Sequence, residues 1–436
     1  MTPSELLRNR PAAGLLVLLA AGPAWAQEGG VADPGHTAYV FACALAVLLM
    51  TIPGLALFYA GLVRAKNVLS VLMQVFATVS VVSILWVLYG YSLAFTDGGS
   101  AQPFIGGLSK VFLQGVTPES VEGAIPELLF VMFMGLFAAI TPALIVGGFA
   151  ERMKFSAVMV FIIVWFTINY VPMAHMGWGG GWVFQWEPQD FAGGNVVHVN
   201  IGIAALVAAW LLGPRREPTM APHNMTMTMS GASLLWVGWL GFCGGCALLA
   251  NGFSMLVVFN TMLGAAGGAT AWMLVEWLHR GKPSMLGIAS GAITGLVAIT
   301  PACGFVGPVG AILVGALASP VCIWAVEKLK PMLGQDDALD VFGIHGVGGI
   351  VGGLLTTVFA LPMFAGQGLP EGRSLLDQML VQVGAMAFSI AFSAITSCIA
   401  LKIAAVCCKG LRVSEEQEEV GLDPSEHGEV GYKLTA

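Results

Sequence analysis

Charged residues are scarce in this chain. Only 10% of its 436 residues are charged, 57% are hydrophobic, and the mean hydropathy is +0.83. This balance excludes an ordinary soluble globule and indicates a polytopic membrane protein. The net charge is -7, and lysine and arginine form no stripe that could follow a phosphate backbone. Nucleic-acid binding is therefore excluded.

Carboxylates and disulfide patterns are also missing from the apolar segments. No filter-like repeat of carbonyls or carboxylates suits a permanently charged ion such as potassium. The cysteines do not form a secreted disulfide framework, because most of them lie within or at the end of apolar runs. Cys243 and Cys246 spell C-x2-C, which leaves a redox or metal interpretation open, but no further ligands accompany them. We expect no metal and no cofactor.

The first residues have the pattern of a secretory signal. Arg8 and Arg10 precede a short apolar run, which ends in Ala24-Trp25-Ala26. An uncleaved first span is the alternative, but the run is well short of the ~20 residues that a spanning helix needs. We predict a cleaved signal peptide over residues 1–26, a transmembrane domain over 27–408 and a polar tail over 409–436.

The apolar runs after this segment predict an all-α polytopic protein with eleven transmembrane helices, the last of them long. Basic residues fall on alternating connections and on the tail, whereas the other set of connections holds only Lys110 and Arg373. By the positive-inside rule the N-terminus is outside and the tail is cytoplasmic. The expected spans lie near 37–62, 68–95, 127–150, 155–177, 192–213, 225–250, 254–276, 285–303, 305–327, 341–362 and 376–405.

Two short sequence motifs, or words, each occur twice and indicate an internal repeat. His-x3-Gly-Ile begins at His198 in the fifth span and at His345 in the tenth, and Thr-Pro-Ala begins at Thr141 in the third and Thr300 in the eighth. The repeat is therefore five spans long, covering spans 1–5 and 6–10. Because five is odd, the second copy is inverted in the membrane, which places a site between the halves near the midplane.

The two histidines are candidates for that site. An imidazole within a span carries a desolvation cost, and such groups mark substrate or proton pathways. Two unrelated histidines, each bonded to a nearby carbonyl, are the alternative. Glycines around both histidines allow close helix approach, and aromatic faces attract a small cation once it is desolvated. The surrounding aromatic residues are Phe133, Phe137, Trp178, Trp239 and Phe242.

The local sequence motifs resemble those of the ammonium transporter (Amt) family of the Amt/Mep/Rh superfamily over roughly residues 35 to 432. The stretches that carry the likeness are IPGLALFYAGLVR at 52–64, DFAGG at 190–194 and DVFGIHG at 340–346. The resemblance implies a homotrimer in a bacterial inner membrane that takes up ammonium as a nitrogen source, with one pore per protomer. Methylammonium is the expected substrate analogue.

The resemblance also implies roles for individual residues. His198 and His345 match the twin pore histidines, Phe137 and Phe242 the stacked gate above them, and Trp178 with Phe133 the outer ammonium-binding vestibule. Asp190 matches an acidic residue below the vestibule. Its distance from His198, eight residues or ~12 Å of helix, favours an orienting role over direct contact. We assign Asp340 the same orienting role before His345.

Cys246 departs from the family, which commonly has serine there. A thiol is a weak hydrogen-bond acceptor, so we expect weaker ammonium recruitment or a shift toward cation-π attraction at the vestibule. This departure leans toward an Rh-like channel for neutral ammonia or carbon dioxide, which stays an alternative. A membrane enzyme is not indicated, because neither histidine segment supplies a nucleophile or metal ligand.

The polar tail after Lys409 is rich in glutamate. Such a run by itself predicts a solvated segment. Its wording resembles the family's regulatory C-terminal region, which implies packing across neighbouring protomers and control by a PII-type protein. An ammonium sensor is a further alternative, although the tail is too short for a soluble output domain.

Overall fold

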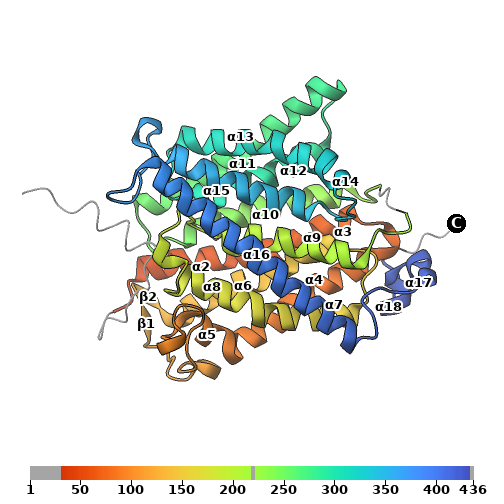
Figure 1. The fold of residues 1–436 in the computed structure, drawn as a ribbon, viewed down its shortest axis with the longest axis horizontal. Helices are drawn as coiled ribbons and strands as arrows, with labels where there is room; N and C mark the ends of the chain where they lie inside the picture. Colours follow the sequence, from red (N-terminus) through yellow and green to blue (C-terminus); the bar gives the residue numbers. More distant parts are fainter. Residues whose placement is uncertain (1–30, 218–220, 433–436) are drawn as a thin grey trace, which may run out of the picture.

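The structure, a computed structural model, describes residues 31–217 and 221–432. Its long helices run side by side along the longest axis of the molecule (Figure 1). A small hairpin of β1 (Val121–Glu122) and β2 (Ile125–Pro126) lies at one end, and α17 (Glu415–Val420) and α18 (Leu422–His427) lie at the other. The expected signal segment, residues 1–26, falls outside the described residues.

Ten helical stretches in the described part of the chain are long and apolar enough to cross a membrane. The expected sixth span contains α10 (Met225–Gly245), which is 21 residues long but is not among the ten, because its Thr, Ser and Gly residues make it less apolar. The membrane-spanning helical fold is thus established, while the count of eleven stays a prediction. The ten stretches are Pro34–Leu62, Ala65–Phe95, Glu127–Phe149, Phe155–Trp178, Gly194–Leu212, Gly252–Arg280, Met285–Ala302, Pro308–Met332, Phe342–Phe359 and Leu375–Cys407.

Several stretches consist of two α-helices joined by one π-helical turn, a feature that is common at functional sites. One such turn contains Pro53, which has no backbone N–H to continue an α-helical ladder. The joined pairs are α2 (Pro34–Leu49) with α3 (Ala56–Leu62), α4 (Val68–Leu85) with α5 (Tyr91–Phe95), α7 (Phe155–Trp165) with α8 (Val171–Trp178), and α13 (Pro308–Trp324) with α14 (Lys330–Met332).

The remaining long helices include the centre of the bundle. Both α6 (Glu127–Phe149) and α12 (Met285–Ala302) are almost wholly buried. A π-helical turn precedes α9 (Asn200–Leu212) and another precedes α15 (Val347–Phe359). The others are α11 (Gly252–Arg280) and α16 (Leu375–Cys407), which has a Ser374–Asp377 capping box at its start.

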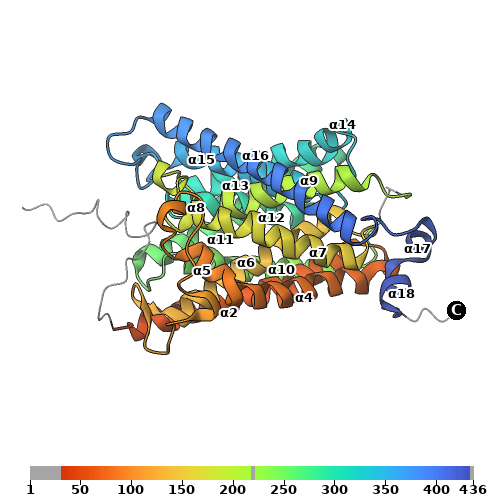
Figure 2. The ribbon, with the colours of Figure 1, turned by 60° about the horizontal axis from the view of Figure 1, so that its bottom comes forward.

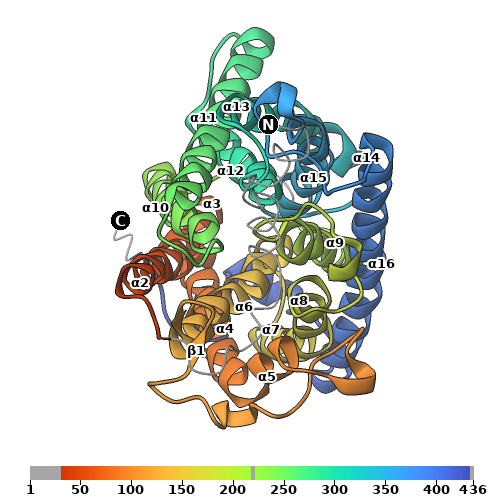
Figure 3. The ribbon, with the colours of Figure 1, turned by 90° about the vertical axis from the view of Figure 1, so that its left-hand side faces the viewer.

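The two halves of the chain form neighbouring groups of helices. In the end-on view of Figure 3, the red-to-yellow helices and the green-to-cyan helices lie next to each other. In the side view of Figure 2, the long blue α16 runs along the bundle. This helix packs on α7 and α9 from the first half and on α15 from the second. The last span therefore joins the two groups.

Reciprocal backbone contacts tie each half to the other. The amides of Phe191 and Ala192 donate to the carbonyls of Pro301 and Thr300 at the end of α12, at 3.0 and 3.2 Å. In the same manner, Leu339 and Ala338 donate to Gly147 and Gly148 at the end of α6, at 3.0 and 3.5 Å. These contacts pair the third and eighth expected spans.

The two Thr-Pro-Ala words do not occupy equivalent places in these helices. Thr300 lies two residues before the end of α12, whereas Thr141 lies eight residues before the end of α6. Gly147, not Thr141, is the counterpart of Thr300 in the reciprocal contacts. The matching words therefore pointed to a pairing of spans that the contacts support, although the register they gave was wrong.

The glycines of the histidine words lie where the two helices are closest. A Cβ added to Gly202 would lie 2.3 Å from the Cα of Gly346, and one added to Gly349 would lie 3.2 Å from the Cβ of His198. Gly202 thus faces the backbone next to His345, and Gly349 faces the backbone next to His198. The repeated His-x3-Gly spacing follows from this backbone-to-backbone crossing.

We predict that Gly202→Ala destabilises the fold by about 1–3 kcal/mol, because the added methyl group meets backbone that cannot rotate away. Thermal unfolding of the purified protein in detergent measures the loss. Gly252→Ala is the matched control, since Gly252 begins α11 in open space and a Cβ there would meet nothing within 4 Å. Equal unfolding temperatures for the two variants would contradict the close crossing.

Candidate functional site

His198 and His345 come together in the middle of the bundle. Each lies in a π-helical turn, Gly194–Val199 or Phe342–Gly346, and the two Nδ1 atoms are 3.3 Å apart. The side chains are buried, with 1% and 5% of their surfaces exposed. One Nδ1 must carry hydrogen and the other must be bare for this contact to be a hydrogen bond. The pair is thus arranged to share one proton.

Thr300 and Trp239 hold the other side of His198. The Thr300 hydroxyl lies 3.3 Å from Nε2 of His198 and accepts a hydrogen bond from the Trp239 indole at 2.8 Å. The indole ring also stacks on the His198 ring, with centroids 5.2 Å apart. Sequence reasoning used Thr300 only as part of a repeated word. It gave no sign that the hydroxyl contacts a histidine.

A column of aromatic rings leads to this pair. Phe137 and Phe242 are stacked with centroids 3.9 Å apart and an interplanar angle of 17°. Trp178, at the end of α8, lies 5.9 Å from Phe137 edge-on, and Phe242 lies 6.4 Å from His198. Phe133 is fully buried behind the column, 5.1 Å from Phe137. The structure therefore brings together every aromatic residue chosen from the sequence.

Cys246 lies one turn beyond Phe242, at the end of α10, and is partly exposed. Its thiol donates to the carbonyl of Phe242 at 3.2 Å. Its only hydrogen is therefore used within its own helix, and the sulfur lone pairs are left as weak acceptors. No group of three or more His, Cys, Asp or Glu residues in the described ranges could hold a metal ion.

Asp190 caps the turn that carries His198. Its carboxylate accepts hydrogen bonds from the backbone amides of Gly193, Gly194 and Asn195, at 3.1 Å for Gly193 and 2.7 Å for Asn195. Burial raises the pKa of Asp190 above its usual value, although these amides stabilise the charged form. The carboxylate satisfies the free amides at a helix start and does not contact the histidine.

Asp340 is placed differently from Asp190. It forms an ion pair with Lys330 and adopts a φ of 60°, in the left-handed region that aspartate tolerates. The same position in the first word is Gly193, with a φ of 108°. Asp337 instead caps the second turn, accepting from the Phe342 amide at 2.7 Å. The repeated Asp-x7-His spacing was available in the sequence and was missed.

The comparisons with known proteins agree with one another. The model of the Ammonium Transporter Family matches residues 38–432. Ammonium transporters of Bacillus subtilis and Aquifex aeolicus are 47% and 46% identical, covering 92% and 97% of this chain and 98% of each relative. The crystal structure of Saccharomyces cerevisiae Mep2 is similar with a TM-score of 0.82 and 35% identity, covering 93% of each chain.

The chain belongs to the ammonium transporter family. Its named relatives indicate transport rather than catalysis, as expected from the sequence. The alternative of a membrane enzyme is thereby left without support.

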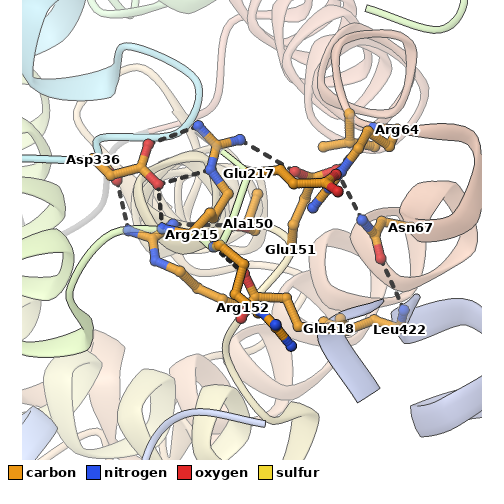
Figure 4. Close-up of polar contacts among 12 residues, drawn as sticks. Arg64, Asn67, Ala150, Glu151, Arg152, Arg215, Glu217, Asp336, Glu418 and Leu422 are labelled. Carbon is orange, nitrogen blue, oxygen red and sulfur yellow. Dashed lines mark hydrogen bonds and ion pairs between the residues drawn. The ribbon is translucent and has the colours of Figure 1, made fainter. Parts of the chain in front are cut away.

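A network of buried ion pairs lies at the end of the protein that bears the tail (Figure 4). Glu151 accepts from Arg64 and from Asn67 through Oε1 and from Arg215 through Oε2, at distances of 2.8 to 3.1 Å. Arg215 also forms a paired contact with Asp336, at 2.6 and 2.8 Å. Removing one partner of such a pair leaves a buried charge uncompensated. The network therefore locks together the connections after α3, α6 and α9.

Two transmembrane helices are capped by carboxylates from the tail. Asp423 accepts from the amides of Leu69 and Ser70 at the start of α4, and Glu426 accepts from the amide of Phe155 at the start of α7. Negative charge is stabilised at a helix N-terminus, so the acidic run has structural partners. These residues therefore pack on helices of their own chain, whereas an acidic run by itself predicts a solvated segment.

We predict that Asp423→Ala loosens the tail by about 1–2 kcal/mol, the usual cost of losing an N-terminal cap. Amide hydrogen exchange of residues 421–432, measured in detergent or nanodiscs, should become faster while the core helices keep their protection. Glu416→Ala is the matched control because Glu416 is exposed on α17. Unchanged exchange in Asp423→Ala would show that the cap does not hold the tail.

Proposed function

We propose that this protein carries ammonium across the plasma membrane of a bacterial cell, one pore in each protomer of a homotrimer. The contact that supports this proposal most strongly is the 3.3 Å separation of the His198 and His345 Nδ1 atoms below the aromatic column. Ammonium is captured at Trp178 together with Phe133, Phe137 or Phe242 and passes inward toward the histidines.

The physical reason for deprotonation is the cost of burying a charge. A desolvated ammonium ion is strongly disfavoured in an apolar pore, whereas neutral ammonia is small and carries no net charge. His198 and His345 accept the proton and pass it on, since each imidazole has two ring nitrogens, one that can accept and one that can donate. The stacked Phe137 and Phe242 rings exclude ions but open for a small molecule.

The proposed orientation of the protein in the membrane rests on the basic residues. Arg64, Arg152, Arg215 and Arg412 gather at the end that bears the tail. The positive-inside rule assigns that end to the cytoplasm and the vestibule to the outside. The tail region, residues 409–436, is the surface that a PII-type regulator and the neighbouring protomers contact.

We predict that His198→Ala together with His345→Ala lowers methylammonium uptake by about a hundredfold, the usual range for loss of acid–base groups. Uptake and membrane current are measured in proteoliposomes. His279→Ala serves as the control, because His279 is exposed at the end of α11 and bonds only within its own helix. Uptake by the double variant at the wild-type rate would refute the proposal, and uptake without any current in the wild type would favour the Rh-like neutral channel.

Cys246→Ser should strengthen recruitment. A serine hydroxyl would donate to the Phe242 carbonyl, as the thiol does, and would also offer a good acceptor to ammonium. A gain of one hydrogen bond of about 1 kcal/mol corresponds to an about fivefold lower KM. Uptake as a function of external methylammonium concentration measures it. Cys246→Ala, which removes the sulfur without adding an acceptor, should not lower KM, and an equal gain in both variants would contradict the interpretation.

A further inference from the structure

An aspartate stands eight residues before each pore histidine. Asp190 precedes His198 and Asp337 precedes His345, and the two pairs share the separation of 147 residues that also divides the histidines. Both aspartates accept hydrogen bonds from backbone amides of the π-helical turn that follows. The positive φ angles at Gly193 and Asp340 occur at the same place in the two segments. Position, backbone and hydrogen bonding therefore match.

The two carboxyl groups differ in how fully they are used. Three amides surround Asp190, and each of its oxygens accepts at least one of them. In Asp337 only Oδ2 accepts a hydrogen bond, from Phe342, while the buried Oδ1 has no hydrogen-bond partner among the described residues. One acceptor oxygen is thus enough at Asp337, whereas Asp190 needs both.

The surroundings of Asp337 also favour a neutral carboxyl group. Burial raises the pKa of Asp337 to about 7, and repulsion from Asp340 adds to the shift, while Lys330 and the Phe342 amide oppose it. Its neighbour Asp336 accepts two hydrogen bonds from the Arg215 guanidinium. Loss of the negative charge at Asp337 therefore disturbs its surroundings less than loss of the acceptor oxygen.

The turn that Asp337 caps has little freedom elsewhere. Gly346 at its far end touches the backbone of Gly202, and the segment before it is bonded to the end of α6 through Leu339. Releasing the Phe342 amide would leave a buried donor unsatisfied at the start of the turn. His345 is three residues further on and would move with it.

We propose that Asp337 is the positioning residue of His345: one carboxyl oxygen fixes the turn that keeps the His345 ring in contact with His198. This inference rests on the proposed role of the histidine pair. It assigns to Asp337 the part that Asp190 takes for His198, with a different tolerance to substitution.

Four variants test it in the full-length protein. Asp337→Ala should lower methylammonium uptake at least tenfold, and Asp337→Asn, which keeps an acceptor oxygen, should stay within about threefold of the wild type. Asp190→Ala and Asp190→Asn should both lose at least tenfold, because an amide NH2 cannot accept the backbone donors. Asp377→Ala is the control: it removes a capping carboxylate from the exposed start of α16 and should leave uptake unchanged.

Each outcome decides the inference. It is overturned if folded Asp337→Ala transports at the wild-type rate, or if Asp337→Asn is as inactive as Asp337→Ala. A cryo-electron-microscopy structure of Asp337→Ala should show the His345 ring moved away from His198, and an unmoved ring would also overturn it. If the alanine variant does not fold, the two asparagine variants decide, since equal losses at positions 337 and 190 contradict the proposal. Full uptake by His345→Ala would instead refute the proposed function itself.

Discussion

The structure depends on a backbone crossing at which two buried imidazole rings meet. Gly202 and Gly346 bring the two helices so close that no side chain fits between them, and His198 and His345 lie beside this crossing with their Nδ1 atoms 3.3 Å apart. In such a buried place a proton on one ring is stabilised mainly by the other ring, because few polar groups are near. The glycines of each motif bring the two helices together, and the histidines of the same motifs meet at that point.

The crossing is held from both ends of the molecule. Asp190 caps one histidine turn on the side of the aromatic vestibule, and Asp337 caps the other on the side of the tail. Asp336, next to Asp337, belongs to the ion-pair network that includes Arg215 and Glu151. Tail residues reach the same network through Asn67, which accepts from the Leu422 amide at 2.8 Å. Hydrogen bonds thus run from the tail through Asn67, Glu151 and Arg215 to Asp336, the residue next to the cap of the His345 turn.

Much of this arrangement could be predicted from sequence, because it is written in local patterns. Apolar runs located the spans, and the repeated His-x3-Gly motif located the crossing. Of the aromatic residues chosen from the family likeness, Phe137, Phe242 and Trp178 lie in one column and Phe133 packs behind it. The sixth span gives a weaker hydropathy signal, because α10 contains small and polar residues that allow close packing. Thr300 and Asp337 could not be assigned roles, because a hydroxyl or carboxyl acts through atoms that come close only in three dimensions. The packing partners of the acidic tail could not be named for the same reason, because the helices it caps are far away in sequence.

Solid-state NMR of the protein in lipid bilayers, with histidines labelled with 15N, tests the shared proton most directly. The account predicts one protonated and one bare Nδ1 in the His198–His345 pair, with a through-bond coupling between the two nitrogens across the hydrogen bond. Single-histidine variants assign the signals. Two protonated Nδ1 atoms, two bare ones, or the absence of any coupling would contradict a proton held between the rings.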